Sequence, residues 1–164
     1  MIAIYAGTFD PITNGHFEMA RRASNIFETV IVGISHASEK KTIFSPEERL
    51  EMAKEVLNTF NNIEIKEYSG LTIDFAKSEK ANVLIRGLRS PFDAQFEFEL
   101  ANMNKRLAED IETVFFSSSG SLAFVSSSLI KQIASEGGDV SEFVHPTVQK
   151  ALQEQFQNQK LCPR

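Results

Sequence analysis

The sequence predicts an α/β fold, a Rossmann-like single domain in which helices cover both faces of a five-stranded parallel sheet. Five short apolar segments have the composition of strands, and segments with apolar residues three and four positions apart separate them. This alternation is typical of a parallel sheet, because a crossover helix must return the chain before the next parallel strand can begin. We expect one domain over residues 1–158 of the 164-residue chain, followed by a flexible tail over residues 159–164.

The expected strands are short, mainly apolar runs: 2–5, 29–34, 63–65, 82–85 and 112–116. Residues 29–34 are apolar without alternation, so this strand is expected to be buried on both faces. The expected helices follow the strands in turn: 14–27, 45–57, 71–78, 91–108, 124–136 and 146–157. The second helix has the clearest start, because Ser45 can cap it, Pro46 suits its first position and Glu48 completes a capping box. In the fourth helix one apolar stripe is expected to face the core or a subunit interface: Phe92, Phe96, Leu100, Met103 and Leu107.

The overall composition argues against several classes of function. The chain has 17 basic and 22 acidic residues, a net charge of −5 and a pI of about 5.3, which argues against bulk nucleic-acid binding. Cys162 is its one cysteine, so no intramolecular disulfide can form and a reducing compartment is expected. We expect no signal peptide, and no apolar run approaches the roughly 20 residues that span a bilayer. We therefore expect a cytoplasmic protein that binds neither nucleic acid nor membrane, without a metal site built by the protein itself.

The first polar stretch after a strand is Ala6-Gly7-Thr8-Phe9-Asp10-Pro11-Ile12-Thr13-Asn14-Gly15-His16. A strand-to-helix loop of this kind can bind phosphate, because the free N–H groups and the dipole at a helix N-terminus attract anions. Gly7 lets the backbone come close to a ligand, Pro11 fixes the turn, and His16 can donate a hydrogen bond to a phosphate oxygen. Each residue alone fits an ordinary turn with a surface histidine, but the eleven together favour a phosphate-binding loop.

Three further polar stretches follow later strands. Arg86-Gly87-Leu88-Arg89 ends the fourth strand, and arginine suits phosphate because its planar fork bonds two oxygens at once. The glycine between the arginines suggests a tight backbone path. Ser126-Ser127-Ser128 lies at a helix start, where serines serve as caps or as phosphate ligands, and the lysine-containing loop 36–41 follows the second strand. Each stretch also fits an ordinary surface role, as ion pairs, caps or solvated lysines.

These four polar stretches are expected to meet, because the carboxyl ends of parallel strands share one edge of the sheet. The sequence therefore predicts an anionic, nucleotide-like ligand at that edge. The chain contains neither the Gly-x-Gly-x-x-Gly fingerprint of dinucleotide-binding folds nor the Gly-Lys-Ser/Thr of a Walker loop.

Three motifs resemble one known superfamily. Gly-Thr-Phe-Asp-Pro followed by Thr-x-Gly-His resembles the (T/H)xGH nucleotidylyltransferases, and Val125 to Lys131 resembles their Ile-Ser-Ser-Thr-x-x-Arg motif with lysine in place of arginine. Arg86 to Arg89 matches the bacterial phosphopantetheine adenylyltransferases in full, and the resemblance covers about residues 2–155. The sister enzymes that adenylylate nicotinamide mononucleotide usually have histidine at the position of Thr13. The resemblance implies transfer of the adenylyl group of ATP to 4′-phosphopantetheine, which gives dephospho-coenzyme A and pyrophosphate.

The resemblance also implies which residues form the site. The catalytic residues would be His16, Thr8, Lys40 and Arg86, with the first two at the α-phosphate of ATP and the other two at the acceptor phosphate. The ATP-binding residues would be Gly7, Thr8, Phe9, His16, Gly87, Leu88, Arg89, Glu97, Leu122, Ala123, Phe124, Val125, Ser126, Ser127 and Ser128. The residues that bind 4′-phosphopantetheine would be Thr8, Lys40, Leu71, Thr72, Arg86, Leu100, Met103 and Asn104. From its helical position alone, Glu97 is expected to be a solvated residue.

The expected reaction is an in-line attack by the acceptor phosphate, which is already an anion near pH 7 because its second pKa is about 6. Catalysis would then rest on positioning and on stabilisation of charge. Mg²⁺ is expected on the phosphates of ATP, and the family is usually hexameric and inhibited by coenzyme A.

Two alternatives remain open from the sequence: a superfamily transferase with another acceptor, such as nicotinamide mononucleotide or glycerol phosphate, and a non-catalytic nucleotide-binding sensor. A sensor could lose members of the phosphate-binding set, but this chain retains Thr8, His16, Lys40, Arg86 and Arg89. It departs from many relatives at Ala6, usually proline, at Phe96, often a tyrosine, and over residues 117–122.

Overall fold

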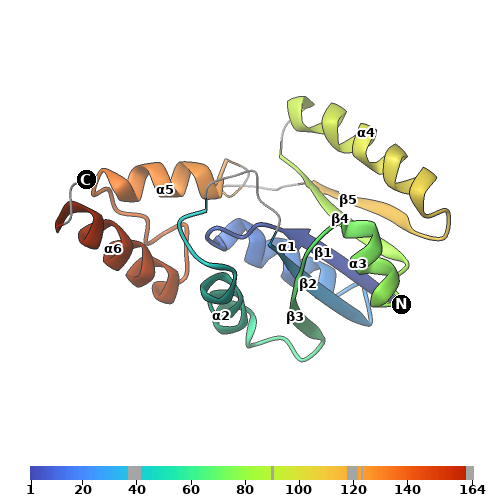
Figure 1. The fold of residues 1–164 in the computed structure, drawn as a ribbon, viewed down its shortest axis with the longest axis horizontal. Helices are drawn as coiled ribbons and strands as arrows, with labels where there is room; N and C mark the ends of the chain where they lie inside the picture. Colours follow the sequence, from blue (N-terminus) through green and yellow to red (C-terminus); the bar gives the residue numbers. More distant parts are fainter. Residues whose placement is uncertain (37–41, 90, 118–121, 123, 162–164) are drawn as a thin grey trace.

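The computed structural model describes residues 1–36, 42–89, 91–117, 122 and 124–161 of the chain (Figure 1). Five parallel strands form one sheet in the order β3-β2-β1-β4-β5. The strands are β1 (Ile2–Gly7), β2 (Thr29–Ser35), β3 (Ile63–Tyr68), β4 (Val83–Leu88) and β5 (Glu112–Ser117). The predicted five-stranded parallel sheet is confirmed, and every strand continues beyond its predicted carboxyl end. β1 is central: Ala3 pairs with Val30 of β2 on one side and with Val83 of β4 on the other.

The helices in the described part of the chain are α1 (Asn14–Ser24), α2 (Pro46–Leu57), α3 (Thr72–Ser78), α4 (Pro91–Leu107), α5 (Ser127–Ser135) and α6 (Pro146–Leu161). The capping box of α2 is confirmed, since the Ser45 hydroxyl accepts the Glu48 N–H at 3.2 Å and the Glu48 carboxylate accepts the Ser45 N–H at 2.7 Å. α5 begins at Ser127 and not at Phe124, because Ser126 takes the cap position and accepts the Leu129 N–H. α1 ends three residues before the predicted Phe27, and α6 continues past the predicted Gln157 to Leu161.

Helices cover both faces of the sheet, as predicted. Alternate residues of β1 enter two separate apolar clusters: Ala3 and Tyr5 pack with residues of α1, α2, α5 and α6, whereas Ile4 and Ala6 pack with residues of α3. Figure 1 shows α5 and α6 together at one end of the molecule and α4 beside β5 at the other. This arrangement leaves the carboxyl edge of the central strands between the two ends. None of the described helices combines the length and apolar character needed to cross a bilayer.

The apolar stripe of α4 is largely uncovered. Phe96, Met103 and Leu107 are 64%, 57% and 53% exposed, so they do not belong to the core, and the alternative of a subunit interface stays a prediction. Leu100 is half-buried, and the side chain of Phe92 lies outside the described part. The next helical face does contact the sheet, where Phe98 packs edge-on against Phe115 of β5, with 5.0 Å between ring centroids. The outer face of α4 therefore presents large apolar side chains to its surroundings.

Candidate active site

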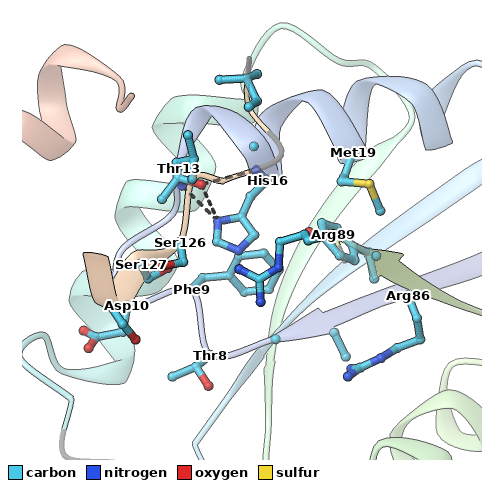
Figure 2. Close-up of a pocket in the computed structure, with 18 of the residues that line it drawn as sticks. Thr8, Phe9, Asp10, Thr13, His16, Met19, Arg86, Arg89, Ser126 and Ser127 are labelled. Carbon is cyan, nitrogen blue, oxygen red and sulfur yellow. Dashed lines mark hydrogen bonds between the residues drawn. The ribbon is translucent and has the colours of Figure 1, made fainter. Parts of the chain in front are cut away.

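The strand order places a crevice beside β1. The chain runs from β1 to β2 and β3 on one side, and β4 then lies on the opposite side of β1. Ligands of open parallel sheets bind at such a switch point, outside the carboxyl ends of the strands. A pocket of about 370 Å³ opens there, between the loop after β1, the end of β4 and the start of α5 (Figure 2). Its volume lies within the usual range for small-molecule sites. We call it the reaction pocket.

Most of the predicted site residues line the reaction pocket: Gly7, Thr8, Phe9, His16, Arg86, Gly87, Arg89, Glu97, Leu122, Val125, Ser126, Ser127 and Ser128. Two predicted ATP-binding residues do not line it. Leu88 is the last residue of β4, and the ring of Phe124 is 60% exposed and packs against Phe143. Lys40 and Ala123 lie outside the described residues, so the structure does not place them. Three of the four polar stretches therefore line one pocket: the loop after β1, the Arg run and the serine run. Residues 37–41 of the fourth stretch lie outside the described residues.

His16 is oriented by the cap of its own helix. The Thr13 N–H donates to Nδ1 of His16 at 3.0 Å, and the Thr13 hydroxyl accepts the His16 N–H at 3.4 Å, which completes a capping box (Figure 2). Because Nδ1 accepts this hydrogen bond, the ring carries its proton on Nε2. Burial, together with the positive charge of Arg89, lowers the pKa of His16 from 6.5 to about 4. His16 is therefore neutral near pH 7 and presents Nε2–H as an uncharged donor.

The ring of Phe9 packs against the ring of His16. Its backbone has a φ of 49°, which is uncommon for a residue other than glycine, and its ring is buried. The ring centroids of Phe9 and His16 are 5.0 Å apart, and Tyr5 packs edge-on against Phe9 at 5.4 Å and lies 6.4 Å from the His16 ring. A Cβ atom at Gly7 would lie 3.1 Å from the Phe9 ring. A side chain at Gly7 would therefore crowd the Phe9 ring, and this packing reason stands beside the close approach to a ligand that the sequence suggested, since Gly7 also lines the reaction pocket.

Arg86 is held by Glu97. Two parallel hydrogen bonds of 2.6 and 2.7 Å join the guanidinium of Arg86 to the carboxylate of Glu97 in α4, and only 13% of the Glu97 side chain is exposed. The prediction of a solvated Glu97 is therefore wrong. β4 includes Arg86, Gly87 and Leu88, so most of the Arg run lies in the strand and only Arg89 follows it. A Cβ at Gly87 would make an ordinary contact of 3.4 Å with Met19, so the expected tight backbone path is absent.

A second, smaller cavity of about 120 Å³ adjoins the reaction pocket, and Arg86 lines both. We call it the arm cavity. Four of the five side chains predicted along the pantetheine arm line it: Leu71, Thr72, Leu100 and Asn104. The fifth, Met103, is 57% exposed and does not line this cavity. Apolar walls with an amide at one side and a guanidinium at the mouth suit an extended ligand that ends in an anion.

The serine run forms the N-terminus of α5. The Ser126 hydroxyl caps the helix, and the Ser127 hydroxyl donates to the Pro11 carbonyl at 2.8 Å, so the ordinary capping role applies to part of the run. The Ser128 hydroxyl has no hydrogen-bond partner within the described residues, and the first N–H groups of α5 face no carbonyl of their own helix. This end of the pocket can therefore bind an anion through backbone N–H groups and one hydroxyl.

Two charged residues near the pocket were not predicted from the sequence. Asp10 is buried and ion-paired with Lys131, the lysine that stands in place of the arginine of the Ile-Ser-Ser-Thr-x-x-Arg motif. Arg49 of α2 is fully buried and donates from Nη1 to the carbonyl oxygens of Thr8 at 2.6 Å and Ser35 at 2.9 Å. An arginine in the first turn of an amphipathic helix looks like a surface residue, so no local signal marks Arg49.

No group of three His, Cys, Asp or Glu side chains able to hold a metal ion occurs among the described residues. The groups around the reaction pocket are instead a neutral imidazole, hydroxyls, a helix N-terminus and two guanidiniums, of which Arg86 is paired closely with Glu97 and Arg89 more loosely with Asp93 at 3.8 Å. Such a set binds phosphates and can hold a charged transition state without providing a nucleophile.

Comparisons with known proteins agree with this geometry. The family described as cytidylyltransferase-like matches residues 4–133. A phosphopantetheine adenylyltransferase of Hahella chejuensis is 47% identical over 153 residues, which cover 93% of this chain and 95% of that protein.

Two solved structures share the fold at low identity. A nicotinic acid mononucleotide adenylyltransferase of Plasmodium falciparum, complexed with NaAD, matches with a TM-score of 0.72 and 18% identity, covering 93% of this chain and 94% of that one. A putative nicotinate-nucleotide adenylyltransferase of Vibrio parahaemolyticus matches with a TM-score of 0.70 and 19% identity, covering 93% and 97%. The chain therefore belongs to the cytidylyltransferase-like family, among the phosphopantetheine adenylyltransferases.

Proposed function

We propose that this protein transfers the adenylyl group of ATP to 4′-phosphopantetheine, giving dephospho-coenzyme A and pyrophosphate. The observation that carries the proposal is the position of Arg86, at the mouth between the reaction pocket and the arm cavity. A phosphate at Arg86 would enter the reaction pocket while an arm with amide groups followed the smaller cavity. The identity of 47% with a phosphopantetheine adenylyltransferase over nearly the whole chain supports the same acceptor.

The reaction would be a direct displacement at the α-phosphorus of ATP. An oxygen of the acceptor phosphate attacks, the bond to the β-phosphate oxygen breaks, and pyrophosphate leaves with the bonding electrons. His16 would donate from Nε2–H to the α-phosphate, and Thr8, whose carbonyl is fixed by Arg49, would present its side chain beside it. Arg86 would hold the acceptor phosphate, with Lys40 as the second proposed cation there. Such a mechanism needs positioning and charge stabilisation and no covalent intermediate.

The triphosphate of ATP would extend toward α5. Arg89 and the N-terminus of α5 at Ser126 to Ser128 line that part of the reaction pocket. Mg²⁺ would enter as part of the substrate, bound to the phosphates, because this cation keeps several waters and binds through substrate oxygens in many sites. The prediction is that chelation of Mg²⁺ stops turnover.

We further propose a homohexamer located in the cytoplasm and inhibited by coenzyme A. The exposed apolar side chains of α4, Phe96, Met103 and Leu107, support burial against other copies of the chain. Coenzyme A contains the pantetheine arm of the proposed acceptor, so it would compete for the arm cavity. Light scattering of the purified protein would test the hexamer, and inhibition by coenzyme A that competes with the acceptor would test the regulation.

The function is tested by measuring pyrophosphate released from ATP and Mg²⁺ with three acceptors offered separately: 4′-phosphopantetheine, nicotinamide mononucleotide and glycerol 3-phosphate. Release with 4′-phosphopantetheine alone is expected, together with dephospho-coenzyme A detected by mass. Release with a different acceptor would keep the catalytic pocket but overturn the role given to Arg86 and the arm cavity. No release with any acceptor, despite ATP binding, would favour the sensor.

A further inference from the structure

We propose that the Asp10 carboxylate is a positioning residue that couples the two sides of the reaction pocket, the segment before α2 and the N-terminal end of α5. This inference rests on the proposed function, because it takes the pocket to hold ATP and an acceptor together. Asp10 lies in the loop after β1, and only 4% of its side chain is exposed. Figure 2 shows its carboxylate on the α5 side of the loop, near Ser127.

On one side the carboxylate holds backbone. Both Asp10 oxygens accept the Ile43 N–H, at 3.2 and 3.1 Å, and Oδ1 also accepts the Phe44 N–H at 3.1 Å. The preceding residue, Thr42, lines the reaction pocket. Asp10 therefore fixes the backbone directly after the segment that contains Lys40, the residue proposed to bind the acceptor phosphate.

On the other side the carboxylate holds α5. Nζ of Lys131 is 2.5 Å from Oδ2 of Asp10, across 121 positions of sequence. The Ser127 hydroxyl adds a second attachment to the same loop, at the Pro11 carbonyl. α5 is thus fixed to the loop after β1 at its first turn and again at its second. Its free N–H groups consequently keep a defined position relative to His16 and Thr8.

The chemistry of this cluster explains why one carboxylate is used for both attachments. A buried carboxylate is tolerated only when its oxygens accept hydrogen bonds and its charge is balanced. Here the two N–H groups come from the acceptor side and the positive charge comes from the ATP side. Loss of either set leaves Asp10 underbonded, so the carboxylate is expected to shift, and the partner on the opposite side loses its position as well.

The consequence is measurable as coupling between the two substrates. Asp10→Asn keeps the shape but replaces one acceptor oxygen by a donor, which must face either Lys131 or the Ile43 N–H. Lys131→Met removes the balancing charge, whereas Lys131→Arg keeps it. Asp10→Asn and Lys131→Met are each expected to raise the apparent constants for ATP and for the acceptor by about fivefold or more, and Lys131→Arg to restore both to within about twofold of wild type. The double variant Asp10→Asn with Lys131→Met should be about as impaired as the worse single variant, because the two residues act as one unit.

The matched control is Asp139→Asn. Asp139 is an exposed aspartate after α5 that accepts the Ser141 N–H at 2.9 Å, so it tests the same chemical change away from the pocket. Its constants should stay within about twofold of wild type. Kinetics would be measured beside thermal unfolding. A lower unfolding temperature with unchanged constants in Asp10→Asn would show a structural role only and would overturn the proposal.

Lys131→Met keeps the proposal testable if Asp10→Asn fails to fold. A change confined to the ATP constant in Lys131→Met would also contradict the coupling. ATP binding measured by calorimetry without acceptor separates this inference from the proposed function. If wild type binds ATP but releases no pyrophosphate, the function fails. Weaker ATP binding in Asp10→Asn and in Lys131→Met, with ATP binding close to wild type in Lys131→Arg, would still support the attachment of α5 through Asp10.

Discussion

Two amide substitutions of different length can separate the roles of the two nitrogens of His16. The carbonyl oxygen of asparagine reaches approximately the position of Nδ1, where it can still accept the Thr13 N–H that the wild-type ring accepts at 3.0 Å. The asparagine side chain is too short to place a hydrogen-bond donor at the position of Nε2. Glutamine is one carbon longer, so its amide can donate near Nε2 while the acceptor at Nδ1 is lost. His16→Asn therefore keeps the helix cap and removes the donor, and His16→Gln does the reverse.

The expected magnitudes follow from the state of the ring. Since the pKa of His16 is about 4, the group removed is an uncharged donor and not a cation, so ground-state attraction for ATP should change little. Loss of one donor preorganised for a transition state costs about 2.7–4 kcal/mol, or about 10²–10³ in kcat. We expect this loss in His16→Asn, with the dissociation constant of ATP changed by less than about threefold. His16→Gln should lose only about tenfold, because its donor remains but is no longer oriented by Thr13.

The assay pairs pyrophosphate release at saturating substrates with calorimetric binding of ATP. His145→Asn is the control, because Nδ1 of His145 accepts the Thr147 N–H at 3.3 Å in a similar cap at the start of α6, and His145 does not line the reaction pocket. Its turnover should equal that of wild type. Two results would refute the reasoning: turnover of His16→Asn close to wild type, or a loss of ATP affinity as large as the loss of turnover.

Three further predictions concern pH, the acceptor and the fold. The pKa of His16 is lowered in the folded state from 6.5 to about 4, so as the pH falls the unfolded chain binds this proton before the folded protein does. Up to about 3 kcal/mol of stability is therefore present above pH 6.5 and is lost as the pH falls toward 4. Urea unfolding at about pH 8 and pH 5 should show a smaller loss for His16→Gln than for wild type, and equal losses would contradict the assignment. Arg86→Ala should chiefly raise the apparent constant for the acceptor, by about tenfold or more, while an effect on the ATP constant alone would assign Arg86 to the other substrate. Ser45→Ala should lower the free energy of unfolding by about 1 kcal/mol without changing turnover, as measured by urea unfolding, since it removes only the α2 cap; a change in turnover would count against that local role.

The parts of the fold that are local in sequence could be predicted. The five strands were visible because each is a short apolar run, and the start of α2 because Ser45, Pro46 and Glu48 act within four consecutive residues. The ends of elements were less accurate. A charged residue after an apolar run predicts that the strand has ended, but β4 continues through Arg86. Glu97 pairs with this arginine and balances its charge at the carboxyl end of the strand. Its partner lies 11 residues away on another element, so no periodic pattern reveals the pair.

In the candidate site, the residues that face the pocket could be predicted, but the residues that hydrogen-bond to them and hold them in place could not. Sequence identified the groups that face the reaction pocket, because their residue types and their positions after strands are visible in the chain. It did not reveal what holds them. Thr13 orients His16 from three residues away, Glu97 holds Arg86 from α4, and Asp10 holds Lys131 across 121 positions.

These partners decide what the pocket can do in a protein with a net charge of −5. An acidic surface gives no long-range attraction for ATP, so the binding energy must come from a few groups at close range. Groups that were free to move would have to be reoriented by the ligand, which would reduce the affinity by the cost of ordering them. In the proposed mechanism, the imidazole, the guanidinium of Arg86 and α5 are held where charge would develop during transfer. Substitution of the partners should therefore weaken catalysis although the phosphate-facing groups remain, and Asp10 is the strongest case because it serves both sides of the pocket.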